Sequence, residues 1–204
     1  MMQNDWAYLE KYALENQKLL KQLNDGIRII FIGDSITEFW ERFDLVFFSQ
    51  NNYINRGISG QTTSQIFERF QSDVIDLQPK CVIILAGIND IAENNGPISL
   101  EKIMENIIKM VEKSLKNSIE VLLCSILPAN SFYWNPKIQP IEKIIQLNQM
   151  IEAYCILKQL DFVDYYTEMV DENLSLDKKY TDDGVHPNLA GYLKMKAILE
   201  THIK

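Results

Sequence analysis

Short apolar runs alternate along the chain with longer stretches in which apolar residues recur at helical spacing. The apolar runs predict five β-strands, at residues 27–32, 52–56, 81–86, 119–125 and 160–164. Stretches long enough for a helix lie between most of them. This alternation is typical of an α/β fold with a mainly parallel sheet that helices cover on both faces. We expect residues 1–204 to form a single domain of this kind.

The spacing also predicts an amphipathic first helix within residues 1–25, packed on the domain. Its inward stripe is interrupted at Asn16 and consists of Trp6, Leu9, Ala13, Leu20 and Leu23. Residues 24–26, Asn-Asp-Gly, should end this helix and turn the chain into the first strand.

Capping residues and further apolar stripes predict the later helices. Thr62 or Thr63 is expected to cap one helix, and Ser99 another. A last helix is predicted from Pro187, Leu189, Leu193 and Ile198, with the proline in its first turn.

Composition and charge narrow the class of protein. Apolar residues make up 47% and charged residues 24% of the chain, as in ordinary globular domains. The net charge of −8 opposes binding to nucleic acids and to anionic lipid surfaces. No apolar run approaches the ~20 residues that a membrane span requires. Residues 1–5 lack the features of a signal peptide, so we expect a cytoplasmic protein, or a secreted one if a signal peptide has been removed.

The cysteines and histidines give no sign of a metal or redox centre. Cys81, Cys124 and Cys155 lie in apolar runs and are interpreted as reduced core residues. The two histidines are far apart and no cysteine pair exists, so we expect neither a metal nor a cofactor. The glycine-rich patterns of nucleotide-binding loops are also absent, which disfavours a nucleotide-binding flavodoxin-like protein.

Four segments carry residues suited to catalysis, and the first three follow predicted strands. They are residues 33–35 (Gly-Asp-Ser), 55–60, 86–90 and 182–187. Parallel strands end at the same edge of a sheet, so the first three segments should lie in neighbouring loops. Ser35 follows a strand and opens a helix, which makes its hydroxyl a candidate nucleophile. Taken alone, the same position also suits an ordinary helix cap.

A nucleophilic serine requires a base, and the chain has only two histidines. His202 lies beside the carboxyl terminus and is expected to be solvated, which leaves His186 as the candidate base. Asp183 precedes it by three residues, a spacing that can bring a carboxylate to the imidazole Nδ1–H. Asp182 is a rival for this role, and either aspartate could instead belong to a turn.

Acyl transfer also requires donors for an oxyanion. Candidates are the backbone N–H groups of Ser35 and Gly60 and the side-chain amide of Asn89. Glycine lets a backbone approach a ligand closely, and an amide donates without carrying charge. A turn glycine and a turn asparagine are the alternative interpretations.

Taken together, the four segments resemble the sequence blocks of the SGNH/GDSL hydrolase superfamily, in the same order. The blocks here are Gly33-Asp34-Ser35, Gly57-Ile58-Ser59-Gly60, Gly87-Ile88-Asn89-Asp90 and Asp183-Gly184-Val185-His186-Pro187. The resemblance spans residues 27 to about 199 and is strongest for compact bacterial acylhydrolases of the acetylesterase type. The α/β-hydrolase pattern Gly-x-Ser-x-Gly is absent around Ser35.

The resemblance implies a fold, a set of site residues and an activity. The fold would be a flavodoxin-like, three-layer α/β/α sandwich with a five-stranded parallel sheet. The catalytic residues would be Ser35 as nucleophile, His186 as base and Asp183 as the acid that orients it. The oxyanion hole would be formed by Ser35, Gly60 and Asn89. The activity would be serine-dependent hydrolysis of a small-molecule ester, without a metal. The family type is compatible with a homodimer, which no residue of the sequence indicates.

The sequence indicates the type of reaction more clearly than it indicates the substrate. Residues 128–136 follow the fourth predicted strand, and Tyr133 and Trp134 could line a pocket or stack on a sugar ring, or pack within the loop. Phe39 and Trp40, just after Ser35, are expected to be ordinary helix-packing residues. A short acyl group, such as acetyl on a carbohydrate, is the favoured substrate. A lysophospholipase or thioesterase acting on longer acyl chains, and a non-catalytic binding module on the same fold, are the alternatives.

Overall fold

The computed structural model describes residues 5–22 and 28–203 and contains one five-stranded parallel sheet. The strand order is β2-β1-β3-β4-β5, with bounds β1 Ile29–Gly33, β2 Tyr53–Gly57, β3 Cys81–Leu85, β4 Glu120–Cys124 and β5 Asp161–Val163. Each lies within two residues of a predicted strand at both ends, so the five-stranded parallel sheet is confirmed. Residue 27, where the first strand was predicted to begin, lies outside the described residues.

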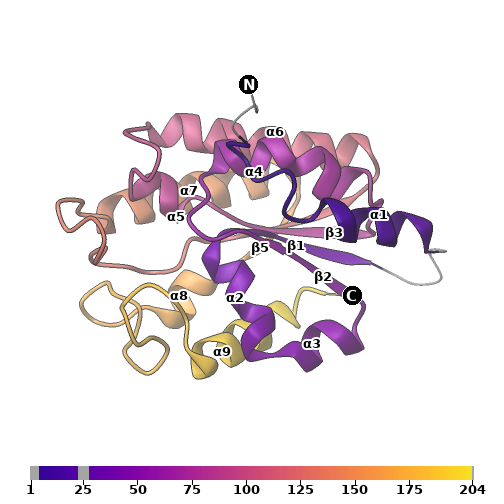
Figure 1. The fold of residues 1–204 in the computed structure, drawn as a ribbon. Coiled ribbons are helices and arrows are strands. Elements are labelled where there is room, and N and C mark those ends of the chain that lie inside the picture. Colours follow the sequence, from indigo (N-terminus) through magenta and orange to yellow (C-terminus); the bar gives the residue numbers. More distant parts are fainter. Residues whose placement is uncertain (1–4, 23–27, 204) are drawn as a thin grey trace.

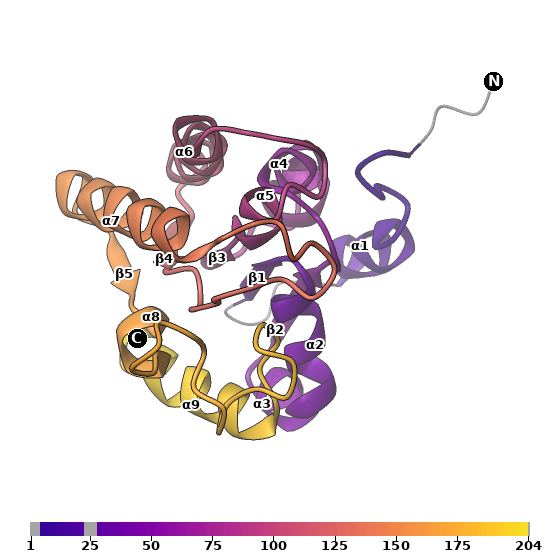
Figure 2. The ribbon, with the colours of Figure 1, turned by 90° about the vertical axis from the view of Figure 1, so that its left-hand side faces the viewer.

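Helices cover both faces of the sheet and give three layers (Figures 1 and 2). One face carries α2 (Ser35–Phe43), α3 (Leu45–Gln50), α8 (Tyr165–Met169) and α9 (Leu189–Leu199). The other face carries α4 (Thr63–Phe70), α5 (Ile88–Ile91), α6 (Leu100–Lys116) and α7 (Ile141–Lys158). The short α1 (Ala13–Lys21) contacts the π-helical turn Gln71–Ile75 that follows α4. The α/β/α sandwich expected from the sequence is therefore confirmed.

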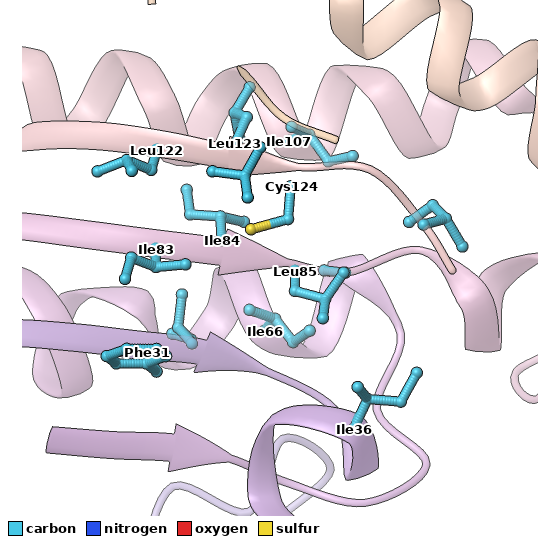
Figure 3. Packing of buried hydrophobic residues seen from close by; sticks show 14 of the residues in the cluster. Phe31, Ile36, Ile66, Ile83, Ile84, Leu85, Ile107, Leu122, Leu123 and Cys124 are labelled. Atoms are coloured by element: carbon cyan, nitrogen blue, oxygen red, sulfur yellow. The ribbon is translucent and has the colours of Figure 1, made fainter. Parts of the chain in front are cut away.

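The core fills the space between these layers. Every residue of β1 and β3 is buried, as expected for central strands that are covered on both faces. Figure 3 shows side chains of neighbouring strands, among them Phe31, Ile83 and Leu122, in one apolar cluster. The three cysteines are free and buried, which confirms their interpretation as reduced core residues.

The first helix is shorter than predicted and turns a different face inward. Of the predicted stripe, Trp6, Leu9 and Leu20 are about half exposed, whereas Asn16 is buried. The Asn16 amide donates to Asp73 Oδ1 over 2.7 Å and accepts from Arg56 Nε over 3.0 Å. The face of this helix that turns toward the domain is therefore set by the hydrogen bonds of Asn16 to buried polar side chains. The prediction of an apolar inward stripe was wrong. Leu23 and the turn predicted at residues 24–26 lie outside the described residues.

The last helix also departs from its prediction. It begins at Leu189 with Asn188 as its N-cap, so Pro187 precedes the helix. Leu189 and Leu193 are about half exposed, and the inward residues are Gly191, Tyr192, Met195 and Leu199. The helix approaches the preceding loop so closely that a Cβ atom on Gly191 would lie 2.4 Å from the carbonyl oxygen of Tyr180. This contact sets the inward face.

The predicted caps agree with the structure. Thr62 is the N-cap of α4, and its backbone N–H donates to Gln65 Oε1 over 3.1 Å. Ser99 caps α6 by accepting from the N–H of Lys102. Both caps supply partners to backbone groups that a helix start leaves unpaired.

Candidate active site

The candidate site lies at the carboxyl ends of β1, β2 and β3. Ser35 is the first residue of α2 and is only 7% exposed. Asp34, between β1 and α2, caps the helix by accepting from the N–H of Ile36 over 3.0 Å. Gly57, at the end of β2, lies directly against α2, because a Cβ atom there would be 2.1 Å from the backbone nitrogen of Glu38. The first two sequence blocks therefore pack against each other without intervening side chains.

A chain of hydrogen bonds joins the three predicted catalytic residues. Ser35 Oγ lies 2.9 Å from His186 Nε2, and His186 Nδ1 lies 2.7 Å from Asp183 Oδ2. With its Nδ1–H donated to the carboxylate, the imidazole presents the Nε2 lone pair to the serine hydroxyl. This arrangement can take a proton from Ser35.

A tight loop holds the imidazole in place. Thr181 and Pro187 form an isolated antiparallel bridge, and Thr181 Oγ1 donates to the carbonyl of His186 over 2.8 Å. Asp183 Oδ1 accepts from the backbone N–H groups of Val185 and His186 over 2.9 and 2.8 Å. One carboxylate thus organises both the backbone and the ring of the histidine.

These contacts also keep Asp183 ionised. Partial burial acts to raise its pKa, but the hydrogen bonds from the His186 ring and from the loop backbone outweigh it and hold the pKa below its usual value. Of the two rival aspartates, Asp183 is the one whose carboxylate contacts the imidazole.

The second histidine is far from this chain of contacts. His202 lines a pocket with Ile29, Cys81 and Asp161, which are the first residues of their strands. It is partly exposed and lies in this surface pocket together with Ile203. It lies at the edge opposite to Ser35.

The predicted oxyanion residues line the same cleft as Ser35 and His186. Gly60 has a φ of +77°, a conformation that favours glycine. Asn89 is 3% exposed, and its Nδ2 donates one hydrogen bond to the carbonyl of Gln61 over 3.1 Å. The four sequence blocks thus meet in one cleft, as expected.

Aromatic rings border the cleft. Trp134 and Tyr133 line it and are 37% and 67% exposed, whereas the neighbouring Phe132 is fully buried. The Trp134 and Phe39 rings lie 6.4 and 5.5 Å from the His186 ring, between centroids. Phe39 packs against the core as expected and in addition lines the cleft, and Trp40 is a core residue as expected.

Asp34 and Asp90 are buried beside the cleft, and the sequence analysis predicted no catalytic role for either carboxyl group. Burial, assisted by nearby Asp90, raises the pKa of Asp34 to about 7. Burial likewise raises the pKa of Asp90 to about 6, although its carboxylate accepts from the N–H and hydroxyl of Thr63. Their burial depends on residues distant in sequence, so no local pattern could have indicated these pKa values.

The described residues offer neither a metal site nor a membrane span. Within residues 5–22 and 28–203, no group of histidine, cysteine, aspartate and glutamate side chains could hold a metal ion. Over the same residues, no helix combines the length and apolar character needed to cross a bilayer.

Comparison with known proteins shows which family the chain matches. Residues 31–194 match the model of the GDSL-like lipase/acylhydrolase family. The crystal structure of a candidate acylhydrolase from Bacteroides fragilis is 44% identical, with a TM-score of 0.95 over 98% of this chain and 97% of that one. A GDSL-like lipase from Bacteroides thetaiotaomicron is also 44% identical, with a TM-score of 0.93 over 96% and 97% of the two chains.

Two curated relatives are more distant. An acetylxylan esterase from Xylanibacter ruminicola is 27% identical over 88% of this chain and 44% of its own length. The uncharacterised lipoprotein YqeF of Bacillus subtilis is 38% identical over 37% of this chain and 32% of its own. The chain therefore spans less than half the length of either curated relative.

Proposed function

Because this chain belongs to the GDSL-like lipase/acylhydrolase family and is an ester hydrolase, we propose that it removes a short acyl group, most simply acetyl, from a carbohydrate. The observation that carries the catalytic part is the continuous hydrogen-bonded chain from Ser35 through His186 to Asp183. A buried serine hydroxyl 2.9 Å from an imidazole that a carboxylate orients is the arrangement of an activated nucleophile.

The proposed reaction proceeds through an acyl-enzyme. Ser35 Oγ attacks the ester carbonyl while its proton passes to His186 Nε2. The tetrahedral intermediate collapses, and the alcohol leaves with that proton. Water then gives a proton to His186 and attacks the acyl group, which releases the acid and restores Ser35. Asp183 stabilises the imidazolium during both steps.

In this proposal the oxyanion accepts from three donors. These are the backbone N–H groups of Ser35 and Gly60 and the Nδ2–H₂ group of Asn89, all of which border the cleft. Ser35 also lies at the amino end of α2, where the helix dipole favours developing negative charge. A fixed set of donors contributes most when it is shielded from water, as the buried Ser35 and Asn89 are.

The rings at the cleft support a sugar ester as substrate. Trp134 and Tyr133 keep enough exposed surface to stack on a sugar ring, while Phe39 and His186 narrow the space beside Ser35. The acetylxylan esterase relative supports the same chemistry, on an acetylated carbohydrate. A long acyl chain, as in a lysophospholipase or thioesterase substrate, is the second candidate, since the same catalytic groups would serve it.

Hydrolysis of p-nitrophenyl esters from acetyl to palmitoyl tests the proposal. We expect turnover to fall steeply beyond butyryl, to vanish in Ser35→Ala, and to persist in the control Ser49→Ala, which alters an exposed serine of α3. Acetylated xylo-oligosaccharides are the next substrates to assay. A preference for long chains would overturn the short-acyl proposal, and turnover that survives Ser35→Ala would overturn the catalytic one.

The compartment is proposed separately. The two candidate compartments are the cytoplasm and, because one relative is a lipoprotein, a location outside it. Fractionation of the native host, with detection by antibody, decides between them.

A further inference from the structure

We propose that Asn94 is a positioning residue that aims the Asn89 amide at the oxyanion, and that the indole N–H of Trp134 fixes the direction in which Asn94 does so. The inference rests on the proposed function, because it deepens the role of Asn89 within that site. Asn94 follows the Gly-x-Asn-Asp block by four residues, where the sequence suggests only a loop asparagine.

The Asn94 side chain contacts three parts of the site at once. Its Nδ2 donates to Asn89 Oδ1 over 2.9 Å and to the carbonyl of Gly60 over 3.2 Å. Its Oδ1 accepts from Trp134 Nε1 over 3.0 Å. A single amide therefore joins two proposed oxyanion residues to the aromatic border of the cleft.

Donor and acceptor types leave one orientation for this network. The indole N–H can only donate, so Asn94 must turn its oxygen toward Trp134. Its NH₂ group then faces Gly60 and Asn89, where the Gly60 carbonyl can only accept. Asn89 must in turn present its oxygen to Asn94, which leaves its own NH₂ group for other partners.

The result is that Asn89 has one N–H available for a substrate. One of its two amide hydrogens is donated to the carbonyl of Gln61, and its oxygen is held by Asn94. Within residues 5–22 and 28–203 the remaining N–H has no hydrogen-bond partner, and Asn89 lines the cleft beside Ser35. A flipped Asn89 would instead present a carbonyl oxygen, which repels an oxyanion.

The local backbone places Asn94 for this task. The short helix α5 ends at Ile91, and Glu93 follows in the left-handed region with a φ of +59°. This turn brings Asn94 back onto the start of α5, where its own N–H donates to the carbonyl of Asn89 over 3.1 Å. The neighbouring Asn95 points elsewhere, toward Thr62 and Gln65 at the start of α4.

Substitutions at Asn94 test the inference with p-nitrophenyl acetate as the probe. Asn94→Asp replaces the donor by a carboxylate that faces Asn89 Oδ1 and Gly60 O, so we expect kcat to fall by about 10²-fold with KM changed less than about threefold. Asn94→Ala should lower kcat less, by about tenfold. Asn95→Asp introduces the same charge one residue away and should keep kcat within about twofold. Equal kcat values for Asn94→Asp and Asn95→Asp would overturn the inference.

A double-mutant cycle separates positioning from general damage. If Asn94 acts through Asn89, Asn94→Ala should cost less than about threefold in kcat once Asn89→Ala is present. Multiplication of the two effects would refute the coupling. Thermal unfolding of each variant shows whether the fold persists.

Trp134→Phe tests the second part of the inference, because it keeps a ring and removes the N–H. We expect kcat to fall severalfold, and an increase in KM alone would show that the indole only binds substrate. Ser35-dependent turnover of the parent protein must be established first. Its absence would refute the proposed function, whereas Ser35-dependent turnover with unaffected Asn94 variants would refute only this inference.

Discussion

Replacing the buried carboxyl of Asp34 by an amide should remove a large pH dependence from the stability of the protein. In the folded protein the pKa of Asp34 rises from its usual 3.8 to about 7, because burial penalises the ionised form and Asp90 adds repulsion. The folded state therefore keeps the proton at pH values where the unfolded chain has lost it. The stabilisation is fully present below about pH 4 and is lost as the pH rises through about 7.

The size of this loss in stability follows from the two pKa values of Asp34, in the unfolded and the folded state. Each unit of pKa difference corresponds to about 1.4 kcal/mol, so ionising Asp34 in the folded protein costs on the order of 4 kcal/mol at neutral pH and above. About 1 kcal/mol of this is already lost at pH 4.5, which leaves roughly 3 kcal/mol to be lost between pH 4.5 and 8. The amide introduced by Asp34→Asn cannot ionise, and its oxygen can still accept from the N–H of Ile36 as the carboxyl cap does now.

Urea denaturation of the parent and of Asp34→Asn, at pH 4.5 and at pH 8, measures this quantity. The difference between the two proteins cancels the contributions of titrating groups that do not interact with Asp34, while the repulsion between Asp34 and Asp90 remains part of the measured difference. We expect that difference in the free energy of unfolding to change by about 3 kcal/mol in favour of the variant as the pH rises. A difference that stays constant within about 0.5 kcal/mol would refute the claim that burial keeps Asp34 protonated.

Three further outcomes are expected. Asn89→Ala should lower kcat by on the order of 10²–10³ on p-nitrophenyl acetate, and a fall below tenfold would count against its role as an oxyanion donor. Asp183→Asn should lower kcat by on the order of 10²- to 10⁴-fold, whereas Asp182→Asn should leave it nearly unchanged; the reverse order would move the orienting role to Asp182. Gly57→Ala should destabilise the protein by more than about 3 kcal/mol in urea denaturation, because its Cβ would overlap the α2 backbone. Gly96→Ala meets no atom within 4 Å and should cost only the strain of its positive φ, so equal losses for the two variants would contradict this account.

The features that could be predicted from the sequence are those with local signals. Central strands are apolar on both faces, so the continuous apolar runs at β1 and β3 predict buried strands. Ser35 was a candidate nucleophile because it lies just after the first of these runs. The order of the four sequence blocks then indicated that Asp183 and His186 belong with Ser35, and the structure brings the three into contact.

The features that escaped prediction depend on partners distant in sequence. Asn16 appeared as a break in an apolar stripe, yet it is buried because Arg56 and Asp73 lie 40 and 57 residues further on. The local sequence around Asn94 does not predict the positioning role proposed for it, because that role depends on a hydrogen bond from Trp134, 40 residues further along the chain. No periodicity within a helix or a loop carries such information.

The separation of 151 positions along the chain between Ser35 and His186 has a consequence for biosynthesis. The serine and the central strand β1 leave the ribosome early, whereas the imidazole follows only after all five strands have been made. The last helix then ties the two ends together, since the Tyr192 hydroxyl donates to the carbonyl of Ile36 over 2.8 Å. A nascent or truncated chain that ends before residue 186 would therefore carry Ser35 without the histidine proposed as its base. Esterase activity that depends on this pair would report that translation has passed His186 and that the segments carrying the two residues have come together.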